Sequence, residues 1–224
     1  MKINVILIIL MVNLGYSQQQ NENWILKINT IQLIDIFSFP TLQISAEKKI
    51  SPYCSLNGEF GYQLYDFKST DTLFLKPKGF KCNLEFRLYI SKYISKRTKS
   101  RESEFYLGIQ TFYRQNQSTN SVSYSPKIDD SKYFTDTFGT LREVKGLNLI
   151  IGWQISISKK LIIEPFLGLG FQSKKIINTN IEYDSEKDIR GGTDLQPLFI
   201  GLNLAESSGS KFNFCNGLKL GYKL

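Results

Sequence analysis

Eleven consecutive residues decide the fold of this chain: FKCNLEFRLYI, residues 80–90. Every even position holds Phe, Cys, Leu or Ile, whereas the odd positions hold Lys, Asn, Glu, Arg and Tyr. Successive side chains of a β-strand point to opposite faces, so this order separates an apolar face from a polar one. Wound as an α-helix, the same residues would place apolar side chains on opposite sides. The stretch therefore predicts a strand with one apolar face.

The same period of two returns along most of the chain after Asn23. It is clear over residues 105–109, 144–158, 161–171 and 212–224, and weaker over 24–36, 41–49 and 54–65. Most of these runs exceed the usual strand of about five or six residues, and they approach the nine to eleven of a tilted membrane strand. We predict an all-β fold, an antiparallel up-and-down transmembrane β-barrel of about eight strands. Residues 195–205 also alternate, and we assign them to a hairpin or loop extension; ten strands is the alternative.

The connections between these runs differ in length. Short breaks at 50–53 and 158–160 alternate with long ones at 66–78, 115–142 and 173–194. Outer-membrane barrels have short turns on one side of the membrane and long loops on the other. The long connections are therefore expected to be outer loops.

Two observations predict that the apolar face meets lipid rather than the interior of a soluble barrel. Moving the register of residues 80–90 by one would turn Lys81, Glu85 and Arg87 toward hydrocarbon, where a basic side chain at the midplane costs about 2–4 kcal/mol. The other observation concerns glycine, because a narrow lumen requires small residues. Eight glycines fall on the polar face: Gly61, Gly108, Gly146, Gly152, Gly168, Gly170, Gly217 and Gly221.

This orientation sends charged side chains into the lumen. An unpaired buried charge is very costly, so we expect these groups to form a salt-bridged plug, with a proton or ion path as the alternative. The predicted lumen charge network consists of Glu47, Glu59, Glu85, Arg87, Arg114 and Glu164. Aromatic girdles are expected at Trp24, Tyr53, Tyr93, Tyr113, Trp153 and Tyr222. Pro165 cannot donate a ladder hydrogen bond, and we expect a bulge there.

The first residues form a targeting signal. Lys2 precedes an apolar core at 3–14, and small residues follow at 15–17. This order predicts a signal peptide over residues 1–17, cleaved after Ser17, and one barrel domain over 18–224. The rest of the chain has no apolar stretch of eighteen residues, which excludes an α-helical membrane protein. The expected location is the cell outer membrane, with its lipids, lipopolysaccharide and the barrel-assembly machinery as partners.

The composition predicts no enzyme. The chain has no histidine, the base that outer-membrane enzymes commonly use near neutral pH. Its three cysteines are far apart and form no CxxC pattern, so we expect neither a metal site nor a disulfide framework. The net charge of +8 is scattered through turns without a nucleic-acid-binding motif. We therefore predict no catalytic residues, no cofactor, no metal and no nucleic-acid partner.

Several longer motifs resemble a known family. They are GFKCNLEFRLYIS (79–91), FYLGIQTFYR (105–114), GLNLIIGWQISISKKLIIEPFLGLGF (146–171) and GLKLGYKL (217–224). These stretches resemble uncharacterised barrel proteins common in Bacteroidota, which are described as domains of unknown function. The resemblance implies the barrel fold and the outer membrane but no activity and no functional residues.

These inferences lead to one functional hypothesis and two alternatives. The leading hypothesis is a small, plugged, non-enzymatic barrel whose outer loops bind a partner, a surface polysaccharide or lipopolysaccharide. The first alternative is a narrow pore. The second is a soluble, secreted, lipocalin-like binding barrel with its faces inverted.

Overall fold

The computed structural model describes residues 24–34, 39–63, 78–91, 103–129, 131–184, 186–190 and 207–224. Its elements are β1 (Trp24–Asn29), the 3-10 helix η2 (Ile31–Ile34), β2 (Leu42–Ser51), β3 (Cys54–Tyr62), β4 (Lys78–Tyr89), β5 (Ser103–Pro126), β6 (Phe134–Ser156), β7 (Leu161–Thr179), β8 (Asp188–Arg190) and β9 (Ser207–Lys223). No helix in these ranges is long and apolar enough to cross a bilayer. The predicted signal peptide, Tyr93 and the alternating segment 195–205 lie outside the described residues.

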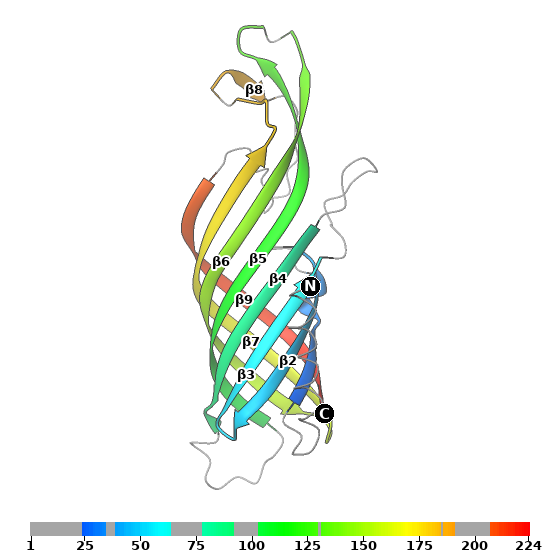
Figure 1. The fold of residues 1–224 in the computed structure, drawn as a ribbon, viewed down its shortest axis with the longest axis vertical. Helices are drawn as coiled ribbons and strands as arrows, with labels where there is room; N and C mark the ends of the chain where they lie inside the picture. The colour runs from blue at the N-terminus through cyan, green and yellow to red at the C-terminus, as the bar shows by residue number, and fades with distance from the viewer. Residues whose placement is uncertain are drawn as a thin grey trace, which may run out of the picture.

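Eight of the strands form a closed antiparallel ring (Figure 1). Each of β1 to β6 pairs with the next strand in the sequence, β7 pairs with β9, and β9 pairs with β1. The short β8 lies outside the ring and pairs with the end of β5. The predicted up-and-down barrel of eight strands is therefore confirmed.

The pairing around the ring gives the tilt of the strands. From Leu26, successive partners are Ala46, Gly58, Leu84, Thr111, Leu147, Phe171 and Phe212. Leu26 itself pairs with Tyr222, so the circuit closes with a displacement of 222 − 212 = 10 residues. With strands about 4.8 Å apart and about 3.3 Å per residue, this displacement tilts the strands by about 40° and gives a backbone radius of about 8 Å. Side chains fill so narrow a ring.

The apolar side chains point away from the barrel. Leu149 is 61% exposed and Ile151 is 51% exposed, whereas Glu85 and Arg87 are 1% and 0% exposed. The predicted orientation is confirmed. The inverted, lipocalin-like arrangement is wrong, because it requires Leu149 and Ile151 to pack in the middle.

Aromatic side chains border this apolar band at both ends. Trp24, Tyr53, Trp153 and Tyr222 lie at the end where the chain termini of the barrel meet, Leu224 donating from its amide to the carbonyl of Trp24. Tyr113 lies at the other border with Phe80, 5.7 Å away between ring centroids, and Phe171 pairs there with Phe212 at 6.2 Å. Ten tilted residues separate the two borders on β9, a height of about 25 Å, which matches the apolar band of outer-membrane barrels.

Glycine makes room for large side chains inside the ring. The ring of Tyr106 lies opposite Gly152 across the β5–β6 ladder, and Phe112 lies opposite Gly146. A Cβ atom at Gly152 would overlap the ring of Tyr106. The polar-face glycines therefore allow aromatic residues to cross a lumen of this radius.

Four details differ from the sequence-based expectations. β7 continues to Thr179, within residues 173–194 that were expected to be a loop. Residues 115–142 were expected to be a loop, but β5 and β6 continue as a hairpin to the pair Tyr124↔Phe134, because strands surrounded by water need no apolar alternation. β1 ends at Asn29 rather than at residue 36, because the chain continues there as the 3-10 helix η2. No bulge forms at Pro165: the β6–β7 ladder skips two pairs between Gly152↔Phe166 and Ile155↔Ile163 and resumes in the same register.

Candidate functional site

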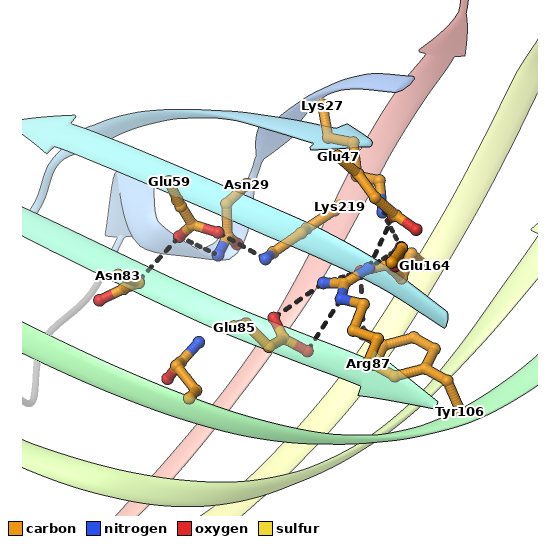
Figure 2. Close-up of polar contacts among 12 residues, drawn as sticks. Lys27, Asn29, Glu47, Glu59, Asn83, Glu85, Arg87, Tyr106, Glu164 and Lys219 are labelled. Atoms are coloured by element: carbon orange, nitrogen blue, oxygen red, sulfur yellow. Dashed lines mark hydrogen bonds and ion pairs between the residues drawn. The ribbon is translucent and has the colours of Figure 1, made fainter. Parts of the chain in front are cut away.

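Arg87 is at the centre of a group of ionised side chains inside the ring (Figure 2). Its Nε and Nη2 donate to the two oxygens of Glu85 at 2.9 and 2.8 Å, since residues i and i+2 of a strand share a face. Nη1 donates to Glu47 at 2.9 Å, and Nη2 lies 3.0 Å from Glu164. One guanidinium therefore binds three carboxylates from β2, β4 and β7.

Lys27 binds two of these carboxylates from the opposite wall. Its ammonium donates to both Glu47 and Glu164, although Glu164 lies 137 residues away in the sequence. All three side chains are fully buried. We call Lys27, Glu47, Glu85, Arg87 and Glu164 the central plug; its ion pairs connect four strands across the lumen.

Neutral donors occupy the remaining carboxylate positions of the central plug. The hydroxyl of Tyr106 donates to Glu164 at 2.9 Å, and the hydroxyl of Tyr89 donates to Glu47. Gln154 donates from one amide nitrogen to Glu47 at 2.7 Å and to Glu164 at 2.9 Å. The Arg87 guanidinium also lies 4.3 Å from the centroid of the Tyr106 ring, a cation–π contact.

A second ion pair lies beside the central plug. Lys219 of β9 binds Glu59 of β3 at 2.5 Å, and both residues are nearly fully buried. Asn83 donates to the other oxygen of Glu59 at 3.2 Å. This pair extends the filled region of the lumen toward β3 and β4.

The buried charges of the lumen balance. The positive members are Lys27, Lys81, Arg87 and Lys219, and the negative members are Glu47, Glu59, Glu85 and Glu164, all at most 5% exposed. Burying ions is tolerable only when each has a partner of opposite charge and its hydrogen bonds are made. Among the described residues, Lys27, Arg87 and Lys219 each bind at least one of these carboxylates, and Lys81 donates to the side-chain oxygen of Gln32 and the carbonyl of Phe39.

The structure brings five of the six predicted lumen residues into this region. Glu47, Glu85, Arg87 and Glu164 belong to the central plug, and Glu59 to the adjacent pair. Arg114 does not join them. It lies eight residues beyond Tyr106 on β5, which places its backbone about 20 Å above that of Tyr106 along the barrel axis. Its guanidinium is 4.6 Å from the centroid of the Phe112 ring, and the residue lines a separate cavity.

The predicted charge network did not include the lysines, although Lys81 is assigned to the polar face of residues 80–90. Lys27, Lys81 and Lys219 all occupy inward positions of their strands. Because every second residue of a strand faces the same side, the alternating pattern could have identified them as lumen residues. The carboxylate partners of Lys27 and Lys219 could not have been assigned, because the alternation does not say which strands face each other across the lumen.

The arrangement resembles a structural plug more than a reaction centre. Each carboxylate of the central plug already accepts hydrogen bonds from two or more donors of the same lumen. Every side chain that forms it is buried, and Tyr89, Tyr106, Ile150 and Phe166 pack into one apolar cluster in the same lumen.

Comparisons with known proteins place the chain in a family. A family model described as "Protein of unknown function (DUF3575)" matches residues 4–198. The chain belongs to this family. The DUF3575 description agrees with the resemblance to proteins of unknown function seen in the motifs. Among solved structures, Acinetobacter baumannii CarO is similar over 93% of this chain and 100% of that chain, with 11% identity and a TM-score of 0.34. No curated protein matches the chain.

Proposed function

We propose that this DUF3575 protein is a closed, non-enzymatic barrel of the outer membrane that binds a surface polysaccharide or the polysaccharide part of lipopolysaccharide outside the cell. One observation carries the proposal. β5, β6 and β7 have 24, 23 and 19 residues, whereas about nine to eleven suffice to cross a bilayer. Their excess length forms a structure above the apolar band that membrane insertion does not require.

We call this structure the surface extension, residues 118–129, 131–140, 177–184 and 186–190. In Figure 1 its β5–β6 hairpin rises beyond the other strands, with β8 beside its tip. The ring of Tyr124 packs on Phe134 and on Tyr183, with both centroids 5.7 Å away. Tyr133 is 75% exposed, and the neighbouring strand positions are rich in Ser and Thr. Exposed aromatic faces beside hydroxyl groups suit a polyhydroxylated ligand, which presents both apolar faces and hydrogen-bonding groups.

The apolar band supports the placement in an outer membrane. Closed barrels are the β-structures that satisfy all backbone hydrogen bonds within lipid, and its height matches that of outer-membrane barrels. Export through the predicted signal peptide, insertion by the barrel-assembly machinery and an origin in Bacteroidota are further parts of the proposal. The absence of histidine from all 224 residues supports a non-enzymatic role.

A shortened hairpin tests the proposal. Ser118 and Thr140 pair directly, so an Asn-Gly turn can join them in place of residues 119–139. The shortened barrel should still show heat-modifiable migration on gels, because its lumen and apolar band are intact. We expect the full chain to bind liposomes that contain smooth lipopolysaccharide and the shortened chain to lose that binding. Equal binding by both, or no binding by the full chain, would contradict the proposal.

A pore is the second candidate, and one observation favours it. Both polar atoms of the Asn57 side chain and the hydroxyl of Ser45 are buried without a hydrogen-bond partner in the described part of the chain. Buried polar groups usually bind water when they lack protein partners, so a thin water path beside the central plug would satisfy them. Conductance of the refolded protein in a planar bilayer separates the candidates: the closed barrel is silent, and steady single-channel currents would establish the pore.

A further inference from the structure

The wall of the barrel has a seam between β1 and β9. β1 pairs with β9 only from Ile25↔Lys223 to Asn29↔Lys219, and the amide of Thr30 adds one bond to the carbonyl of Leu218 at 2.9 Å. On its other side, β9 pairs with β7 as far as Ile176↔Ser207. In the described residues, the edge of β9 above Leu218 therefore has no ladder partner on the β1 side.

This seam lies within the apolar band. The backbone of Leu218 faces β1, and alternate residues of a strand direct their backbone groups to the same side, so Asn216, Phe214 and Phe212 also face the seam. Their side chains point outward, with Phe212 61% and Phe214 58% exposed. A strand edge is not tolerated against lipid unless it borders protein or a polar cavity. The edge of β9 at the seam must therefore border either protein or a polar cavity.

Such a cavity is present, with a volume of about 320 Å³. Five consecutive residues of β9, 212–216, line it together with Gln32, Arg114, Arg142 and Gln172. Asn213 and Cys215 occupy inward positions of β9, as do Arg114, Arg142 and Gln172 on their strands, so the cavity lies in the upper lumen against β9. β7 covers one edge of β9 along this stretch, so the edge that faces the seam is the one beside which a ligand could enter the cavity from the outer leaflet.

The cavity ends above the central plug. Lys81 donates to the side-chain oxygen of Gln32 at 2.9 Å and to the carbonyl of Phe39 at 2.7 Å. Gln32 and Phe39 are themselves lining residues. Below them the paired carboxylates fill the lumen, so the cavity is a side pocket and not part of a path across the barrel.

We propose that the seam is a lateral entrance through which a long-chain fatty acid passes from the outer leaflet into this cavity. The carboxylate binds Arg114 and Arg142, and the acyl chain lies along Phe212 and Phe214 toward the lipid. Arginine binds carboxylates through two parallel hydrogen bonds, and its five donors serve such a ligand beside an existing contact. The described lining residues include two arginines and no acidic residue. The volume is at the lower limit of small-molecule pockets, which suits a headgroup with the start of one chain.

This site is separate from the surface extension, and the polysaccharide proposal does not depend on it. The test uses the full chain, refolded in dodecyl maltoside and titrated with the fluorescent fatty acid cis-parinaric acid. We expect saturable binding at one site, and at least tenfold weaker binding by Arg142→Gln and by Arg114→Gln. Lys145→Gln is the matched control, because Lys145 lies on β6 three residues from Arg142 but on the outer face. Heat-modifiable migration verifies that each variant is folded.

Competitors and rates complete the test. Oleic acid should displace the probe, whereas oleyl alcohol, which has the same chain and no charge, should not. Asn216→Trp, which places a bulky ring on the seam, should slow association at least fivefold relative to Asn216→Ala. The proposal is wrong if the arginine variants and Lys145→Gln bind alike, if the alcohol competes as well as the acid, if only lysophospholipid displaces the probe, or if both Asn216 variants associate equally fast.

Discussion

Ionic side chains pair in two regions of this protein, and the surroundings of the pairs are opposite. In the central plug, Arg87 and its carboxylates are withdrawn from water almost completely. In the surface extension, Lys132 binds Asp129 at 2.8 Å with the two side chains 66% and 40% exposed. The contact distances are alike, yet exposed pairs contribute little to stability, while breaking a buried pair leaves an uncompensated charge. Burial, more than the contact distance, therefore determines how much each ion pair contributes to the stability of the protein.

The same contrast holds for the outer faces of the two regions. In the apolar band, most outward positions are aliphatic or aromatic, because charged groups are costly in hydrocarbon. In the surface extension, polar residues occupy both faces of the hairpin, since water surrounds it. Four predictions, in order of decreasing expected effect, test this contrast between the buried barrel and the exposed extension.

The largest effect is expected at Arg87. Arg87→Met leaves the carboxylates of Glu47, Glu85 and Glu164 with one fewer cation, and it should lower the free energy of unfolding by about 3–5 kcal/mol. Urea unfolding in lipid vesicles, followed by tryptophan fluorescence, measures it. Lys132→Met in the surface extension should leave the midpoint unchanged. If Arg87→Met unfolds at the midpoint of the parent protein, the central plug is not held by its charges.

A charge on the lipid-facing side should have the next largest effect. Leu149→Arg turns a guanidinium toward the middle of the apolar band and should destabilise the barrel by about 2–4 kcal/mol. Thr137→Arg, at an exposed position of β6 in the surface extension, should have almost no effect. The same urea titration compares them. Equal tolerance of both would mean that Leu149 does not face hydrocarbon.

Glycine substitutions compare the lumen with the lipid face. Gly152→Ala introduces a Cβ that overlaps the Tyr106 ring, and this ring is held by its bond to Glu164; overpacking of this kind costs about 1–3 kcal/mol. Gly58→Ala is the control, because a Cβ there meets nothing within 4 Å. It should be neutral or slightly stabilising. Thermal unfolding on gels shows both effects, and a neutral Gly152→Ala would indicate a lumen with spare room.

The smallest effect concerns Asp129. The Lys132 ammonium and the Ser131 hydroxyl bind this carboxylate and lower its pKa below the usual value of 3.8. A lowered pKa means that the stabilisation is present above the unfolded pKa and is lost as the pH falls through the folded value. Lys132→Ala should raise the pKa of Asp129 toward its usual value, as measured by NMR titration. An unchanged titration would show that Lys132 is not bound to Asp129 in solution.

Part of the fold and of the central plug could be predicted from single stretches of sequence. The order of residues 80–90 assigned Glu85 and Arg87 to the lumen, because in a strand each position belongs to one face and a shift by one residue exchanges the faces. The alternation along β5 could not show that Arg114 lies outside the central plug. Parity predicts the direction of a side chain but not its height along a tilted strand, and Arg114 lies far above the plug.

The sequence by itself determined that this chain forms a barrel with its aliphatic side chains outside, since hydrocarbon rejects ions and a two-residue period separates them from apolar groups. The tertiary structure alone decided which charges meet. Lys27 and Glu164 are 137 residues apart, and only the closure of eight strands with a displacement of ten brings them together. It also decided where β1 leaves the wall and how far β5 and β6 extend into water, because chain direction and pairing across the ring depend on neighbours that no single stretch of sequence contains.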